Sequence, residues 1–223
     1  MPTVPIDTNG CLLVLSPKRE SEAVRRSADL LIALFAGLLL SPAVFVIALL
    51  VRVSMGRPVF FMQARIGRDG VPFQLVKFRT MTNARIDSGR LLSDEARITP
   101  LGRFLRRTRL DELPELLNVV KGEMSLVGPR PWVASTLAAL GEAGRHRSAV
   151  RPGLTGWAQV NGNTRLSDTD KLALDLWYID HRSLALGVAI LLRTLGVVLR
   201  GERIVTRRLE QARAYALHRY RVG

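Results

Sequence analysis

The hydrophobic pattern of the chain is dominated by one uncharged run near the N-terminus. Residues 30–51 read LLIALFAGLLLSPAVFVIALLV and contain no charged side chain. A straight helix of this length reaches about 33 Å, enough to cross the hydrocarbon core of a bilayer. The run is longer than the apolar part of a secretory signal, and no small-residue cleavage site follows it. We therefore expect it to remain in the protein as a membrane segment.

Ser41 and Pro42 lie near the middle of this run and predict a break in the helix. Pro42 has no backbone donor for the carbonyl of Leu38, and its ring clashes with that carbonyl. Each half is then about 15 to 18 Å long, too short to cross a bilayer alone. The Ser41 hydroxyl can donate to a freed carbonyl one turn back, which makes such a break tolerable in lipid.

Cations flank the run in equal number on both sides, at Lys18, Arg19, Arg25 and Arg26 before it and at Arg52, Arg57, Arg65 and Arg68 after it. Cationic flanks favour the cytoplasmic side of a membrane. We therefore expect residues 18–56 to form a re-entrant helix-break-helix that enters one leaflet and returns. The alternative is a kinked helix that spans the bilayer. Residues 1–17 show no periodicity and predict a loose arm.

The segment 57–81 predicts a small β-hairpin, because two short β runs surround the turn Gly67-Arg68-Asp69-Gly70. The period of two in the second strand places Lys77 and Arg79 on one face, about 7 Å apart. This spacing suits the oxygens of a diphosphate. It also suits two solvated cations on an edge strand.

Beyond Thr99 the pattern becomes helical. An apolar stripe that includes Phe104 lies beside several arginines, so this helix could lie among anionic headgroups or pack on a soluble core. The apolar segment 182–199 carries Arg193 in its middle, which favours an interfacial or packed helix over a second span. Residues 205–223 predict a basic tail near phosphates or lipid headgroups. The fold class is thus α+β, mainly helical, with interfacial helices around a cytosolic catalytic core at 57–204.

Length and charge restrict the partners. A chain of 223 residues favours one domain with attachments. The net charge of +14 favours polyanions, namely nucleic acid, phosphorylated small molecules or anionic lipid, although an arginine excess can also reflect genomic base composition. The chain lacks the signatures of common nucleic-acid modules, so we expect no nucleic-acid partner. The single Cys11 excludes an intramolecular disulfide and a cysteine metal cluster.

Two adjacent carboxylates, Asp111 and Glu112, follow a cluster of arginines and precede Pro114. One interpretation is structural: Asp111 caps a helix whose first turn contains Pro114. The other is functional, because an ionised carboxylate at a helix start can bind a divalent metal or attack phosphorus.

Arg130 lies between Pro129 and Pro131, which restrict the backbone and would present a rigid guanidinium for bidentate phosphate binding. A simple loop after a helix is the alternative. Arg151 opens the glycine-rich segment 151–162, which could wrap a nucleotide or turn a corner.

Together, KFRTM (77–81), TPLGRFLRRTRLDELPELLNVVKGEMSLVGPRP (99–131) and RPGLTGWAQVNG (151–162) follow an apolar segment interrupted at Ser41-Pro42. This order closely resembles the bacterial sugar transferase family, the monotopic polyprenyl-phosphate phosphoglycosyl transferases, in a minimal form. The resemblance implies transfer of a phosphosugar from a nucleotide diphosphate sugar, expected to be a UDP-sugar, to polyprenyl (undecaprenyl) phosphate with release of UMP. It implies the cytoplasmic face of the bacterial inner membrane as the location, and the initiation of glycoconjugate or exopolysaccharide assembly as the role.

The resemblance also implies roles for individual residues. Asp111 would form a covalent phosphosugar intermediate and bind Mg²⁺, with Glu112 as a second ligand or as a base. The expected substrate-binding residues are Lys77, Arg79, Arg106, Pro129, Arg130, Pro131 and Arg151. A non-catalytic, basic membrane scaffold is the alternative function, and it leaves the two carboxylates without a role. A homo-oligomer is left open.

The sequence departs from the family pattern at three places. Residues 163–170 lack a Trp-containing group, which leaves the sugar and base contacts open. Gly187 replaces an acidic residue, and Glu115 stands where Gln is usual, a change we expect to matter less.

Overall fold

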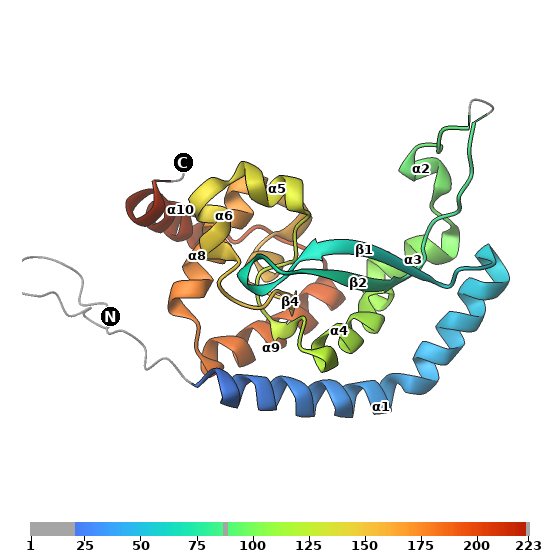
Figure 1. The fold of residues 1–223 in the computed structure, drawn as a ribbon, viewed down its shortest axis with the longest axis horizontal. Helices are drawn as coiled ribbons and strands as arrows, with labels where there is room; N and C mark the ends of the chain where they lie inside the picture. Colours follow the sequence, from blue (N-terminus) through green and yellow to red (C-terminus); the bar gives the residue numbers. More distant parts are fainter. Residues whose placement is uncertain (1–20, 87–88, 222–223) are drawn as a thin grey trace, which may run out of the picture.

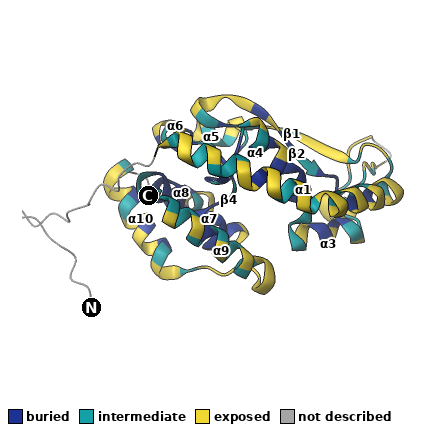
Figure 2. Cartoon of the chain, turned by 90° about the horizontal axis from the view of Figure 1, so that it is seen from below, coloured by how far each residue is buried: buried dark blue, intermediate teal, exposed yellow. Residues whose placement is uncertain are grey.

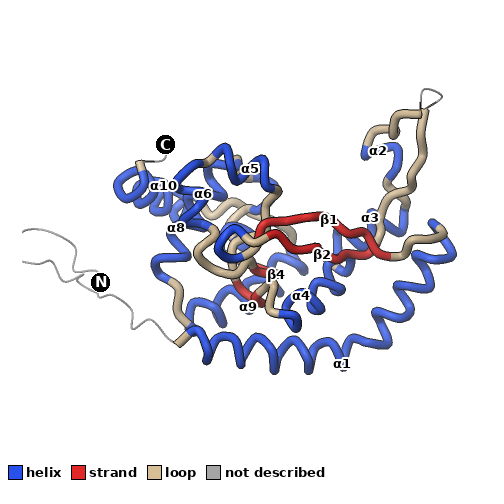
Figure 3. The backbone as a smooth tube through the Cα atoms, in the orientation of Figure 1, coloured by secondary structure: helices blue, strands red, loops and turns tan. Residues whose placement is uncertain are grey.

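The computed structural model describes residues 21–86 and 89–221 as a mainly helical protein with two small sheets (Figures 1 and 3). The expected α+β, mainly helical class is confirmed. The predicted arm at 1–17 lies outside the described residues. The helices are α1 (Glu22–Met55), α2 (Asp94–Arg97), α3 (Pro100–Thr108), α4 (Leu116–Lys121), α5 (Ala134–Ala139), α6 (Gly141–Arg147), α7 (Trp157–Val160), α8 (Asp168–His181), α9 (Leu184–Arg200) and α10 (Thr206–Tyr220). The strands are β1 (Phe60–Ile66), β2 (Pro72–Phe78), β3 (Ser125–Val127) and β4 (Gly153–Thr155), and three short 3₁₀ turns cover Arg68–Gly70, Leu110–Glu115 and Asn163–Arg165.

Helix α1 is one continuous helix, which corrects the expected helix-break-helix. Pro42 lies inside it, and the helix curves in Figure 1 without being interrupted. The physical reason is local: Pro42 removes one donor, and the Ser41 hydroxyl donates to the carbonyl of Leu38 at 2.8 Å, which satisfies the group that the proline leaves unpaired. The expected role of Ser41 is thereby confirmed, with a bend in place of a break.

Both halves of α1 pack on the same protein body. In the N-terminal half, Arg26 donates to the carbonyls of Val119 and Val120 at 2.6 and 2.8 Å. In the C-terminal half, Ile47 and Val51 are buried in a cluster with buried side chains of β2 and α3. Helix α1 is therefore tied to the body at both ends.

The other side of α1 is apolar and exposed. Only 11% of its most apolar window is buried, and α1 is the one helix among the described residues that is long and apolar enough to cross a membrane. In Figure 2, the exposed surface of α1 and the exposed residues of α9 are visible in the same view. The exposed side chains of α1 include Leu31, Leu34, Phe35, Leu38, Leu39, Phe45, Val46, Leu49 and Val53.

The predicted β-hairpin is confirmed as an antiparallel pair in which Phe61 lies opposite Lys77. Its turn includes Asp69 and Gly70, both with positive φ, a conformation that glycine adopts without strain. Strand β2 packs on the 3₁₀ turn Leu110–Glu115, and this contact brings Lys77 to the two adjacent carboxylates.

The largest core cluster lies around α7, α8, α9 and α10. The segment predicted as a basic tail forms α10, which buries Leu209, Ala212 and Ala216 and packs on α8. Arg213 pairs with Asp170 of α8 at 2.7 Å. The segment expected to be a basic tail is therefore a packed helix that belongs to the same body as α8.

Candidate active site

The turn Leu110–Glu115 carries the two carboxylates and begins after a left-handed residue. Arg109 ends α3 with φ of 61°, and its backbone N–H bonds back to that helix. No side chain caps the 3₁₀ turn or α4. The structural interpretation of Asp111 as a helix cap is therefore wrong, because Arg109 precedes the 3₁₀ turn and Asp111 lies inside its first turn.

Glu112 is the point where three cations meet. Its Oε1 lies 2.8 Å from Lys77 Nζ, 2.6 Å from Arg130 Nη2 and 3.6 Å from Arg109 Nη1. Burial opposes the charge of Glu112, but these cations outweigh it and hold the pKa of Glu112 well below its usual range. Glu112 is therefore an ionised anchor whose Oε1 is already used by these cations.

Asp111 has the opposite environment. It is buried, and its Oδ1 has no hydrogen-bond partner among the described residues. Burial raises the pKa of Asp111, and the negative charge of Glu112 raises it further, against the attraction of Lys77 and other cations. A carboxylate with a free oxygen in a cationic cleft is able to accept a metal ion or an electrophilic phosphorus.

Glu115 is more important in the structure than the sequence indicated. It is buried and lies 3.1 Å from Lys77 Nζ. Burial raises the pKa of Glu115, and the Glu112 charge adds to this increase, although Lys77 opposes it. Lys77 thus bridges Glu112 and Glu115, and both carboxylates fix its position beside Asp111.

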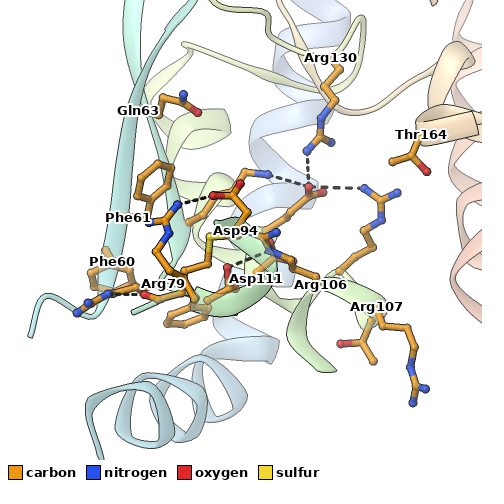
Figure 4. Close-up of a pocket in the computed structure, with 18 of the residues that line it drawn as sticks. Phe60, Phe61, Gln63, Arg79, Asp94, Arg106, Arg107, Asp111, Arg130 and Thr164 are labelled. Carbon is orange, nitrogen blue, oxygen red and sulfur yellow. Dashed lines mark hydrogen bonds and ion pairs between the residues drawn. The ribbon is translucent and has the colours of Figure 1, made fainter. Parts of the chain in front are cut away.

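The two carboxylates open onto a cleft of about 1350 Å³. Figure 4 shows Arg130 above Asp111, with Phe61 and Gln63 on one side and Thr164 and Arg107 on the other. The walls come from β1, β2, residues 79–83, Asp94, Arg97, α3 and the C-terminal end of α9. Six of the predicted site residues line the cleft: Lys77, Arg79, Arg106, Asp111, Glu112 and Arg130.

Arg79 lines the cleft, but its guanidinium is largely occupied. Its Nε donates to the carbonyl of Met81 at 2.8 Å, and its Nη1 donates to the carbonyls of Met55 and Arg57 at 3.2 and 3.1 Å. Arg79 therefore connects the end of α1 to the wall of the cleft. The guanidinium of Arg106 is less occupied than that of Arg79: its Nε donates to the Thr80 hydroxyl at 3.0 Å.

Three predicted substrate-binding residues do not line the cleft. Arg151 donates to the Gly122 carbonyl at 2.9 Å and to Glu22 at 2.6 Å, so it ties α1 to the body. The carbonyls of Pro129 and Pro131 accept hydrogen bonds from the Gly153 N–H and from Arg65, respectively. The two prolines hold the backbone of Arg130, and only the arginine side chain enters the site.

Sequence reasoning missed a second set of cleft residues. Glu202, just beyond α9, accepts hydrogen bonds from Arg109, from the Asn163 amide and from Thr164. These contacts place Thr164 and Arg165 on the cleft wall. The only signal in the sequence was the departure from the family pattern at 163–170, because the pairing of Glu202 with a distant turn depends on the fold.

Asp111 is the carboxylate of this site that would hold a divalent metal. Among the described residues, no three acidic, histidine or cysteine side chains gather as a metal site. Glu112 Oε1 is committed to its cations, so Asp111, which lines the cleft and forms no ion pair with the described residues, is the carboxylate that fits. Mg²⁺ commonly takes one or two carboxylates and completes its shell with water and substrate phosphates. The site therefore fits a Mg²⁺ ion that arrives with a diphosphate, with Asp111 as the protein ligand.

Comparison with known proteins gives one consistent result. The family model of the bacterial sugar transferases matches residues 20–201. The uncharacterized sugar transferase EpsL of Bacillus subtilis (strain 168) is 46% identical over 181 residues, which cover 81% of this chain and 90% of EpsL. The exopolysaccharide production protein ExoY of Sinorhizobium fredii is 37% identical over 191 residues, covering 78% and 84%.

A named enzyme is also similar. The UDP-glucose:undecaprenyl-phosphate glucose-1-phosphate transferase of Escherichia coli K12 is 39% identical over 182 residues. The match covers 77% of this chain and 39% of that enzyme, so the chain corresponds to less than half of the larger protein. Family model and relatives agree, and the chain belongs to the bacterial sugar transferase family.

Proposed function

We propose that this protein transfers a phosphosugar from a UDP-sugar to undecaprenyl phosphate and so initiates exopolysaccharide or other glycoconjugate assembly. The observation that carries the proposal is Asp111, a buried carboxylate with a free oxygen in a cleft lined by cations. The relatives support the substrate classes, because they include a UDP-glucose:undecaprenyl-phosphate glucose-1-phosphate transferase.

The reaction has two displacements at one phosphorus. A carboxylate oxygen of Asp111 attacks the sugar-proximal phosphorus; the bond to the bridging oxygen breaks, and UMP leaves with that oxygen. An oxygen of undecaprenyl phosphate then attacks the same phosphorus, and the bond to Asp111 breaks. The product is a diphosphate-linked lipid sugar, and the carboxylate is regenerated. Two smaller barriers replace one larger barrier.

The charged residues around Asp111 orient the donor and stabilise its phosphates. Arg130, Lys77 and Arg106 present positive charge to the two phosphates of the donor, in a cleft where charge interactions are less screened than in water. Glu112 fixes Arg130 and Lys77 at 2.6 and 2.8 Å. Because its pKa lies well below the usual range, Glu112 is a poor proton acceptor, and we assign it to positioning these cations in preference to the expected role of base. Bound Mg²⁺ would supply charge neutralisation of the diphosphate, held by Asp111.

The packing of α1 supports the membrane arrangement that we propose. A spanning helix would have its ends on opposite sides of the bilayer, but both ends of α1 contact one body. The curved helix with its apolar outer face fits a re-entrant position in one leaflet, on the cytoplasmic face of the inner membrane. Helix α9 also exposes apolar side chains, among them Leu192, Leu195 and Leu199.

Cysteine labelling tests this topology. In a Cys11→Ala background, Val24→Cys and Ser54→Cys place thiols at exposed positions near opposite ends of α1. In intact spheroplasts we expect neither thiol to react with a membrane-impermeant maleimide, and both to react after permeabilisation. Leu38→Cys, in the middle of the apolar face, should stay protected in both cases. Labelling of one end in intact spheroplasts would show a span and reject the re-entrant position.

The activity is tested with purified protein in nanodiscs. Candidate UDP-sugars and undecaprenyl phosphate are supplied with Mg²⁺, and UMP and the lipid product are measured by mass spectrometry. We expect UMP and lipid-linked phosphosugar to form together with at least one donor, and chelation by EDTA to stop turnover. Formation of UDP in place of UMP would indicate a simple glycosyl transfer and contradict the proposal. Turnover that is unaffected by EDTA would reject the role of Mg²⁺.

A further inference from the structure

The cleft has two chemically different ends. One end, at β1, presents Phe61 and Gln63, and the other end lies between α3, the turn 163–165 and the end of α9 (Figure 4). The second end combines unpaired cations with exposed apolar side chains. This combination matches a ligand that carries a phosphate on a long hydrocarbon chain.

The cations at this end are Arg107 and Arg165. Both are exposed, both line the cleft, and neither guanidinium forms an ion pair or hydrogen bond with the described residues. They differ from Arg130 and Arg109, which are engaged with Glu112, and from Arg79, which is engaged with backbone carbonyls. Arg107 and Arg165 are therefore free to accept a second anion without breaking an existing contact.

The apolar part comes from the last turns of α9. Val197, Val198 and Leu199 line the cleft, and Leu199 is 83% exposed. The same helix continues outward with Leu195 and Leu192, which are 62% and 64% exposed. An apolar strip thus runs along α9 from the outer surface to the cleft that Arg107 and Arg165 also line.

We infer that this strip is the entrance for the lipid acceptor. The phosphate of the polyprenyl phosphate binds at Arg107 and Arg165, and its first isoprene units lie on Val198 and Leu199. The inference rests on the proposed function and adds the location of the acceptor, which the donor chemistry leaves unassigned. The arrangement leaves the β1 end of the cleft for the nucleoside and brings the acceptor to Asp111 from the opposite side. The competing explanation is that Arg107 and Arg165 bind the phosphate of a bulk anionic lipid in place of the acceptor phosphate.

The two half-reactions separate the acceptor site from the donor site. Protein in neutral phosphatidylcholine nanodiscs is first given donor and Mg²⁺ alone, and adduct formation is followed by intact mass. Undecaprenyl phosphate is then added, and the decay of the adduct is measured against acceptor concentration. A parallel series uses geranyl phosphate, whose two isoprene units carry the same phosphate on a short chain.

For Arg107→Gln we expect adduct formation at the wild-type rate and an increase of about tenfold in the half-saturating concentration of both acceptors. For Leu199→Gln we expect an increase of up to about tenfold for undecaprenyl phosphate and a much smaller one for geranyl phosphate. Arg103→Gln, on the same helix as Arg107 but outside the cleft, is the matched charge control and should behave as wild type. Leu192→Gln removes a similar apolar surface away from the cleft and should have a smaller effect than Leu199→Gln.

Several results would overturn the inference. Unchanged acceptor dependence in both Arg107→Gln and Leu199→Gln would exclude this entrance, and slower adduct formation in Arg107→Gln would place that residue in the donor site. An Arg107 effect that appears only when phosphatidylglycerol is added would assign the charge to bulk lipid. If wild-type protein gives product without an adduct, the covalent mechanism fails, and steady-state acceptor dependence of the same variants still tests the entrance.

Discussion

Replacing Asp111 with asparagine is expected to abolish the covalent adduct and to lower turnover by at least about four orders of magnitude, the scale of a lost nucleophile. The amide keeps the shape of the carboxylate but cannot form the acyl phosphate. The measurement is intact-mass detection of the adduct with donor and Mg²⁺, followed by peptide mapping of the wild-type protein. Mapping of the phosphosugar to another residue would reject Asp111 as the nucleophile while leaving the overall transfer intact.

The same substitution is expected to preserve the fold, because Asp111 contributes an unpaired buried charge. Removing that charge relieves repulsion with Glu112 and lowers the cost of burial. We expect the melting temperature to stay equal or rise. Asp168→Asn is a matched control, since Asp168 is an exposed carboxylate on α8 outside the cleft that pairs with Lys171 at 2.9 Å. It should leave adduct formation at the wild-type level. A melting temperature that falls in Asp111→Asn would mean that the carboxylate stabilises the fold.

The local elements of this fold were predictable because they depend on nearby residues. The uncharged run, the hairpin turn at Gly67–Gly70 and the helical stripe after Thr99 each leave a local signal in the sequence, and each element is present. The effect of Pro42 was overestimated. A proline removes one hydrogen bond, and the Ser41 hydroxyl replaces it at the Leu38 carbonyl, so the helix bends and continues.

The candidate site was predictable in its centre and less so at its edges. Asp111, Glu112, Lys77 and Arg130 come together as the family resemblance implied. Arg151 could not be placed from sequence, because its partner Glu22 is far away along the chain. The difference between the two adjacent carboxylates was also hidden, since only the fold shows which one the cations occupy.

Arg130 depends on a buried ion pair that no local pattern indicates. Its carbonyl accepts a hydrogen bond from Arg147 Nη2 at 2.6 Å, and Arg147 also binds Asp175 Oδ2 through Nε and Nη2 at 2.9 and 2.7 Å. The Arg147 guanidinium lies 4.0 Å from the centre of the Trp132 ring. Arg147 therefore connects α8 to the backbone that presents Arg130, and it acts on the site only through that backbone.

Arg147→Met is expected to destabilise the protein by about 3–5 kcal/mol, because it leaves Asp175 buried without its partner. This is a large share of a typical folding free energy of about 5–15 kcal/mol. Burial raises the pKa of Asp175 even with Arg147 present, and without Arg147 the pKa rises further. A raised folded-state pKa means that the native state binds the extra proton. The stability of the variant should therefore increase as the pH falls from neutral, measured by thermal unfolding in nanodiscs.

The double variant Arg147→Met/Asp175→Leu separates stability from positioning. Replacing both charges with apolar groups removes the unpaired carboxylate, and we expect most of the lost stability to return. The hydrogen bond to the Arg130 carbonyl stays absent, so kcat/KM should remain about 10- to 100-fold below wild type, the cost of a small misplacement at a reacting centre. Full recovery of kcat/KM together with stability would show that the pair serves folding alone. Recovery of stability without activity would identify Arg147 as a positioning residue, because a purely structural role predicts that the two quantities return together.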